Sequence, residues 1–243
     1  MTKATPFDAM FSSVIGKEYD MLHLICPAAT EMSRLVGITV NDYSSASKPL
    51  QVVELGGGTG ITTLAMLSGK SLLQILSIDN EPTMQDQAKV YLKKWVDEDV
   101  LSFCGEDALT ALKNLADDSV DIIASAYTIH NFLNSYREQV IQEIFRVLKP
   151  SGQFINGDRY ALNDIRQHTR LIQKELSQYF KVLSPMGRND LLEQWIVHLF
   201  NDESEDHIMR ESAALQQMQT AGFIHINVNN RIEGNALITA IKP

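Results

Sequence analysis

The chain has 243 residues, of which 44% are hydrophobic and 21% charged, as in globular proteins with a substantial core. Its formal net charge of −9 disfavours nucleic acid as a partner, because a negative field repels phosphate backbones. Two cysteines without metal-ligand spacing, an N-terminus without a signal-peptide pattern and the lack of an apolar run of about 20 residues predict a cytoplasmic protein without a membrane span.

Residues 1–48 are predicted to form an N-terminal helical cap that ends in a polar linker. In residues 49–158, strand-like segments alternate with helix-like ones, and the helical segments include 81–95 and 136–148, the latter ended by a turn at 149–152. The predicted strands are 50–55, 72–78, 100–104, 120–126 and 152–158. Strands rich in Val, Ile and Leu that alternate with helices predict a mostly parallel sheet of the α/β class.

Residues 159–203 are predicted to form a helical insertion, because apolar side chains recur there at spacings of three and four. An insertion after the fifth strand could cover the carboxyl ends of the sheet as a substrate lid. The same apolar stripes fit core packing or a homodimer surface formed by the 159–200 helices, and both interpretations stay open. Residues 204–243 are expected to close the core with a helix and a strand pair.

A glycine-rich loop, "GGGTG" at residues 56–60, directly follows the first strand. Glycines at this place let the backbone turn tightly and approach a ligand, which the N–H groups of the next helix can then bind. The dinucleotide fingerprint requires a third glycine at position 61, where the chain has Ile61, so the loop argues against NAD. "SGKSL" at 68–72 lacks the first glycine of a phosphate-binding loop, because Leu64 stands there.

Five motifs in chain order resemble those of the class I S-adenosylmethionine-dependent methyltransferases. They are "ELGGGTG" (54–60), "SIDNEPTM" (77–84), "GEDAL" (105–109), "VDIIASAYTIHNF" (120–132) and "VLKPSGQFINGD" (147–158). The resemblance implies a Rossmann-like fold with a mostly parallel seven-stranded sheet and helices on both faces. It also implies S-adenosyl-L-methionine as cofactor, with S-adenosyl-L-homocysteine as its product.

The resemblance assigns the amino-acid end of the cofactor to the glycine loop. Gly56 and Gly58 would pass beneath it, and Glu54 would face its ammonium group directly or through water. Tyr19 would reach its carboxylate, and Tyr127 would line the region of methyl transfer. Simpler roles stay open for two of these side chains, since Glu54 fits a solvated strand end and Tyr19 fits packing between cap and sheet.

The adenosine end is assigned to the ends of the second and third strands. Asp79 would accept hydrogen bonds from both ribose hydroxyls, since a carboxylate has two acceptor oxygens. The adenine would lie along Asn80 and Met84, with Asp107 and the Ala108 amide at its amino group. Glu106 could take the place of Asp107. Helix capping is the alternative role for Asp79 and for the pair of Glu106 and Asp107.

Histidine suits a base that acts near neutral pH, and the catalytic candidate is His130, which follows the fourth strand. His168 and His198 on the insertion are weaker candidates. No metal site is expected, and the acidic run at 201–206 is interpreted as a solvated helix start.

The expected function is methyl transfer to a small-molecule acceptor, whose identity and reacting atom the sequence leaves open. "SAYTIHNF" after the fourth strand replaces the Asn-Pro-Pro-aromatic motif of enzymes that methylate amino groups in nucleic acids and on protein glutamine. One alternative is an enzyme similar to the carboxy-S-adenosylmethionine synthases of tRNA wobble-uridine modification, with Arg188 holding the added carboxylate. Another is a non-catalytic module that only binds the cofactor.

Overall fold

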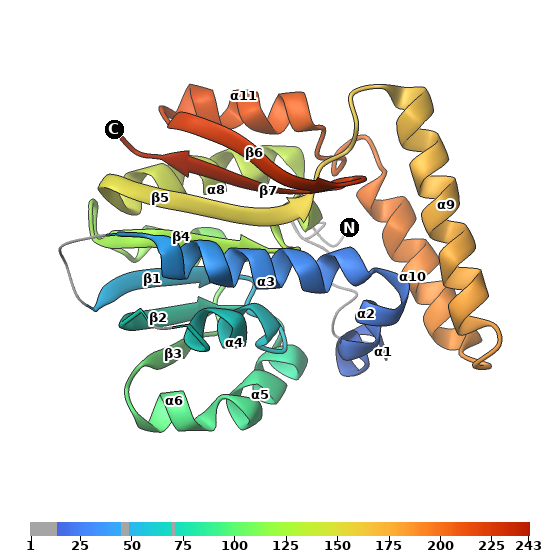
Figure 1. Ribbon diagram of the computed structural model, residues 1–243, viewed down its shortest axis with the longest axis horizontal. Coiled ribbons are helices and arrows are strands. Elements are labelled where there is room, and N and C mark those ends of the chain that lie inside the picture. Colours follow the sequence, from blue (N-terminus) through green and yellow to red (C-terminus); the bar gives the residue numbers. More distant parts are fainter. Residues whose placement is uncertain (1–13, 45–48, 70) are drawn as a thin grey trace, which may run out of the picture.

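The computed structural model of the protein describes residues 14–44, 49–69 and 71–243. Its centre is a seven-stranded sheet in the order β3-β2-β1-β4-β5-β7-β6 (Figure 1). The strands are β1 Leu50–Leu55, β2 Leu73–Ile78, β3 Leu101–Cys104, β4 Val120–Ala126, β5 Leu148–Arg159, β6 Ile224–Ile232 and β7 Asn235–Ile241. Neighbours among β1 to β5 run parallel, whereas β7 is antiparallel to both β5 and β6. The predicted fold class is therefore confirmed.

Helices cover both faces of this sheet and one of its ends (Figure 1). Those before β1 are α1 Val14–Lys17, η2 Tyr19–Met21, α2 Leu22–Ile25 and α3 Pro27–Asp42. Those between the parallel strands are α4 Ile61–Leu67, α5 Pro82–Tyr91, α6 Lys93–Asp97, α7 Ala108–Lys113, η3 Ile129–Asn131 and α8 Asn134–Val147. After β5 come α9 Ile165–Leu183, α10 Asn189–Asp202 and α11 Glu211–Ala221.

Successive residues of the central strands point to opposite faces, as strand geometry requires. In β1, Val52 packs into a cluster with side chains of α3 and α4, whereas Val53 packs into a second cluster with α7, α8 and α11. Ile122 and Ile123 of β4 divide in the same way. Two helical layers thus bury a sheet that is apolar on both sides, which explains the continuous apolar runs in its sequence.

A third cluster lies beyond the carboxyl ends of the strands, where α2, α9 and α10 stand (Figure 1). It joins Ile25 of the N-terminal segment to Tyr179 of α9 and Trp195 of α10. The N-terminal helices and the insertion after β5 therefore form one apolar unit at the end of the sheet where α/β folds bind ligands.

Two predicted elements differ from the structure. The predicted helix 81–95 is divided at Leu92 into α5 and α6. The backbone of Leu92 is not helical, with φ −104° and ψ 13°, and its side chain is buried. The predicted turn at 149–152 belongs to β5, where Ser151 has a positive φ of 66° and the register with β4 shifts. A search of the described residues finds no helix that is both long and apolar enough to cross a membrane.

Candidate functional site

A cleft of about 490 Å³ opens at the carboxyl ends of β1, β2, β3 and β4. Nine of the ten residues predicted to bind the cofactor line it, and Glu54 does not. The nine are Tyr19, Gly56, Gly58, Asp79, Asn80, Met84, Asp107, Ala108 and Tyr127. This gathering follows from the topology, since the loops after adjacent parallel strands meet at one edge of the sheet.

The glycine loop leaves room that any side chain would fill. Gly56 and Gly58 have φ values of 69° and 53°, in the left-handed region that favours glycine. A Cβ at Gly56 would lie 1.9 Å from the Thr128 Oγ1 atom, and one at Gly58 would lie 3.1 Å from the Met84 methyl group. The loop thus presents bare backbone to the cleft, which fits a cofactor that approaches its amides closely.

Glu54 lies beneath the glycine loop and not in the cleft. Its side chain is 0% exposed and accepts hydrogen bonds from Thr63 Oγ1 at 2.6 Å and Ser77 Oγ at 2.7 Å. Burial raises its pKa to about 7 despite these hydrogen bonds. The Oε1 atom is buried without a hydrogen-bond partner among the described residues. The interpretation as a solvated strand end is wrong, because the strand turns this side chain toward α4. Its predicted contact with the cofactor remains a prediction.

Asp79 sits at the end of β2 with both oxygens turned to backbone amides. The Gly58 N–H donates to Oδ2 at 2.7 Å, and the Glu81 N–H donates to Oδ1 at 2.8 Å. Burial raises its pKa above the usual aspartate value, although both hydrogen bonds act to lower it. Each carboxylate oxygen can accept a second hydrogen bond, so a vicinal diol can still bind here. The helix after it is capped by Glu81, which accepts from Thr83 N, so capping does not explain Asp79.

Asp107 does cap a helix, and it also faces the cleft. It is the N-cap of α7, where its Oδ1 accepts from Thr110 N at 3.1 Å and from the Tyr136 hydroxyl at 2.6 Å. These hydrogen bonds hold its pKa below the usual aspartate value despite partial burial. Glu106 also lines the cleft but is exposed and accepts from Asn114 Nδ2. Asp107 is the more firmly oriented of the two carboxylates.

Tyr127 closes the inner end of the cleft with a strained backbone. Its φ is 52°, which is rare for a bulky side chain. The Tyr127 hydroxyl donates to Asn235 Oδ1 and lies 3.2 Å from the Cys26 sulfur. Tyr19 also lines the cleft and packs on Trp195 of α10, with ring centroids 6.4 Å apart, so this contact joins the N-terminal segment to the insertion.

A second cavity of about 410 Å³ is lined chiefly by α9, by the connection between α2 and α3 and by the turn between β6 and β7. Between it and the cleft is a narrow space that we call the junction, of about 20 Å³. The junction shares Tyr19, Leu22, Tyr127 and Asn131 with the cleft, and shares Cys26, His130, Arg159, Glu175 and Asp202 with the second cavity. Cleft, junction and second cavity therefore lie in a row, and each neighbouring pair shares side chains in its walls.

His130 stands in the junction, and it is 5% exposed. Its Nδ1 atom lies 2.5 Å from Asp158 Oδ1, a carboxylate at the end of β5. Arg137 fixes the same loop, because its guanidinium donates to the carbonyls of Ile129, His130 and Phe132. Since Asp158 occupies Nδ1, the Nε2 atom of His130 is the one available to accept a proton or bind an ion.

The insertion histidines differ in their surroundings. His168 Nε2 lies 2.7 Å from Glu203 Oε2, and its Nδ1 accepts from the Leu162 backbone N–H, so structural hydrogen bonds hold it. His198 lies in the junction near His130, with ring centroids 6.5 Å apart. Asp202, one turn after His198 on α10, is 6% exposed. The interpretation of 201–206 as a solvated helix start is therefore wrong for Asp202, which ends α10 with its side chain turned inward.

Several residues that orient the site were not predicted from the sequence. Tyr136 orients Asp107, Asp158 orients His130, and Arg159 forms an ion pair with Glu175 inside the junction at 2.6 Å. Only the tertiary structure brings α9 and α10 against the end of β5, so spacing along the chain could not reveal these contacts. Asp158 was the exception, since its place at the carboxyl end of a strand could have marked it.

Comparison with known proteins gives a consistent result. The model of a methyltransferase domain matches residues 53–156. An uncharacterised methyltransferase of Schizosaccharomyces pombe is 32% identical over 114 residues. The match covers 47% of this chain and 41% of that protein's length. A demethylmenaquinone methyltransferase of Leptospira interrogans is 26% identical over 88% of this chain and 86% of its own length. A carboxy-S-adenosyl-L-methionine synthase of Ruthia magnifica is 24% identical over 70% of this chain and 68% of its own.

The fold also matches solved structures. An S-adenosylmethionine-dependent methyltransferase of Thermotoga maritima superimposes with a TM-score of 0.59, and the match covers 96% of this chain and 98% of that one. The two sequences are 15% identical, so this likeness concerns the fold alone.

Proposed function

Because the chain belongs to the class I S-adenosylmethionine-dependent methyltransferase family, we propose that it methylates a small-molecule acceptor held in the second cavity. The observation that carries the proposal is the row of cleft, junction and second cavity, with His130 where the two ligands would meet. Methyl transfer needs donor and acceptor in line and shielded from water, which two cavities joined at a narrow junction provide.

In this proposal the cofactor occupies the cleft and supplies a methyl group on a sulfonium centre. Asp79 would bind the ribose diol with the free lone pairs of its two oxygens, and Asp107 would accept from the adenine amino group. The amides of the glycine loop would contact the amino-acid end. The Tyr127 hydroxyl donates a hydrogen bond to Asn235, and the Tyr127 side chain would form the wall of the cleft beside the methyl group.

Size and lining of the second cavity favour a small acceptor with both apolar and polar parts. A volume of about 410 Å³ is in the usual range for small-molecule sites. Ile25, Leu171 and Met209 line it with apolar surface, while His130 and Arg159 stand at its inner end. The Leptospira relative is by name a demethylmenaquinone methyltransferase, which agrees with an acceptor of this kind.

His130 is the side chain proposed to act on the acceptor. Its Nε2 atom faces the junction and Asp158 fixes the orientation of its ring, so the acceptor's reacting atom would lie against it. A group that assists deprotonation at this place contributes about a hundredfold or more to the rate of transfer to an acidic acceptor.

The carboxy-S-adenosylmethionine synthase alternative is supported by the Ruthia relative. Arg188, the predicted holder of the added carboxylate, lines none of the three cavities and pairs with Asp190 at 2.9 Å. Arg159 does reach the junction, where Glu175 pairs with it. Mass analysis of a ligand that co-purifies with the protein separates the two activities, since a carboxylated cofactor would favour the synthase.

The proposal is tested with S-adenosylmethionine that carries a trideuteromethyl group and a panel of quinols, phenols and amines. We expect S-adenosylhomocysteine to form only with a suitable acceptor, which gains one trideuteromethyl group. His130→Asn should lower this rate about a hundredfold while binding of S-adenosylhomocysteine persists, and His225→Asn, a change at an exposed site on β6, should alter neither. Tight cofactor binding without transfer to any acceptor would instead support the non-catalytic module.

A further inference from the structure

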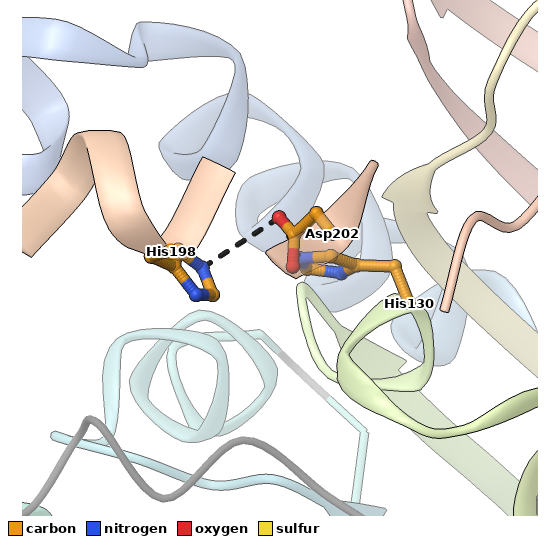
Figure 2. Close-up of side chains that lie close together, drawn as sticks. All are labelled: His130, His198 and Asp202. Carbon is orange, nitrogen blue, oxygen red and sulfur yellow. Dashed lines mark ion pairs between the residues drawn. The ribbon is translucent and has the colours of Figure 1, made fainter. Parts of the chain in front are cut away.

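The junction contains three potential metal ligands from two distant parts of the chain. His130 follows β4, whereas His198 and Asp202 lie on α10, and Figure 2 shows the three side chains turned toward one another. Asp202 Oδ2 lies 3.6 Å from His130 Nε2 and 3.7 Å from His198 Nε2. The three ligand atoms lie within 4.8 Å of one another. Ligands that are each about 2.1 Å from a tetrahedral ion are about 3.4 Å apart, so the two Asp202 distances are close to those that an ion needs, and the remaining approach falls to the side-chain rotamers.

The neighbouring elements hold these groups in the orientation that a metal needs. Asp158 at His130 Nδ1 leaves Nε2 as the ligating atom, and a carboxylate behind the imidazole is the usual second partner of a metal-bound histidine. His198 and Asp202 are four residues apart on α10, so one helix face presents both.

Asp202 also has a buried carboxylate oxygen that no described residue satisfies. Its side chain is more than nine-tenths buried, and its Oδ1 atom has no hydrogen-bond partner among the described residues. An unpaired carboxylate oxygen in such surroundings costs free energy unless an ion, a proton or a ligand satisfies it. Arg159 Nε approaches only the other oxygen, at 3.8 Å.

The charges around the junction also favour a cation. The carboxylates of Asp158, Glu175, Asp202 and Glu203 face the guanidiniums of Arg137 and Arg159. Around the junction, these four carboxylates therefore outnumber the two guanidiniums that face them.

We propose that His130, His198 and Asp202 bind a divalent first-row transition ion, Zn²⁺ or Fe²⁺. Two imidazoles and one carboxylate suit these ions, and three protein ligands leave coordination positions open. The open positions would face the acceptor in the second cavity, so the ion would bind an acceptor oxygen and favour its anionic form; this use of the ion rests on the proposed function. With the ion bound, His130 Nε2 is a ligand and no longer acts as a base, so the ion promotes loss of the acceptor's proton, which leaves to water.

The site is tested by titrating metal-stripped protein with Co²⁺, whose visible absorption reports nitrogen and oxygen ligands, followed by competition with Zn²⁺. We expect one Co²⁺ per chain, displaced by Zn²⁺. His198→Asn and Asp202→Asn should each weaken binding at least tenfold, whereas His225→Asn should leave it unchanged. Circular dichroism and S-adenosylhomocysteine affinity, measured on every variant, show that the fold and the cleft are intact.

The metal site would be overturned if the wild type did not bind Co²⁺. It would also be overturned if both junction variants bound Co²⁺ as tightly as the wild type. The proposed function would survive this result as long as the wild type binds S-adenosylhomocysteine and methylates an acceptor. Loss of those two properties, with Co²⁺ binding intact, would overturn the proposed function and leave the metal site standing.

Discussion

His130 Nδ1 lies 2.5 Å from Asp158 Oδ1, both side chains are buried, and His130 lines the junction between the cleft and the second cavity. The contact sets the direction in which the opposite ring nitrogen points. Asp158 also accepts from the backbone N–H groups of His130 and Arg159, at 3.3 Å and 2.8 Å, so the carboxylate itself is firmly held. Asp158 is a positioning residue that acts through His130.

Asp158→Asn is predicted to lower kcat at least tenfold with little change in KM, because an amide no longer fixes the imidazole orientation. Steady-state kinetics across pH would measure this, and the pH profile should change shape as well as height. Asp121→Asn is the matched control, since Asp121 is also a buried aspartate but pairs with Lys149 at the far end of β4. Equal losses in both variants would mean that Asp158 has only a structural role.

Asp79→Ala is predicted to weaken S-adenosylhomocysteine binding about tenfold or more, as expected when hydrogen bonds to a charged group worth about 1.5–3 kcal/mol are lost. Asp86→Ala on the exposed side of α5 is the control and should bind normally. Calorimetry on the two variants is the measurement. An unchanged affinity for Asp79→Ala would contradict the ribose assignment.

Gly58→Ala separates backbone strain from cofactor binding. Gly58 and Gly187 both have positive φ values, of 53° and 70°, so alanine should cost each variant about 1–2 kcal/mol of folding free energy. A Cβ at Gly187 meets nothing within 4 Å, whereas one at Gly58 faces Met84 in the cleft. We expect denaturation to show similar losses in the two variants and titration to show weaker cofactor binding only for Gly58→Ala. The assignment of the loop fails if Gly58→Ala binds as Gly187→Ala does.

We expect the buried Glu54 carboxyl group to make the free energy of unfolding depend on pH. Burial raises its pKa from 4.5 to about 7, so the folded state holds a proton that the unfolded state releases. Its contribution to stability is fully present below pH 4.5 and is lost as pH rises toward 7, with a total of about 3 kcal/mol.

Glu54→Gln removes this ionisation, so the variant should gain stability relative to the wild type as pH rises from 5 to 8. Urea denaturation at the two pH values measures the difference, and Glu98→Gln at an exposed position should show no such trend. A Glu54→Gln difference that stays constant with pH would show that Glu54 titrates normally in the folded state.

The strand pattern predicted most of the sheet and the cleft. β1 and β4 have the predicted bounds, and Asp79 and Asp107 lie in the cleft because each follows the end of a parallel strand. Their roles toward the cofactor remain predictions. Glu54 shows the limit of this reasoning. It shares a strand face with Val52, so it points beneath the loop to Thr63 of α4, and strand alternation could have indicated this.

The junction could not be predicted, because long-range packing creates it. His130 and Asp202 are far apart in the sequence, and Asp202 lies in an acidic run that is typical of solvated surface. Asp202 is buried only because α10 packs against the N-terminal helices and α9. The predicted homodimer through the 159–200 helices remains a prediction.

The proposed ligand of the cleft is S-adenosylmethionine. Calorimetric titration of the purified protein with S-adenosylmethionine, S-adenosylhomocysteine and NAD, after removal of any co-purified ligand, measures this binding. We expect the two adenosyl ligands to bind at micromolar concentration, with weaker binding in Asp79→Ala, and no heat with NAD. Absence of binding by either adenosyl ligand, or preferential binding of NAD, would contradict this proposal.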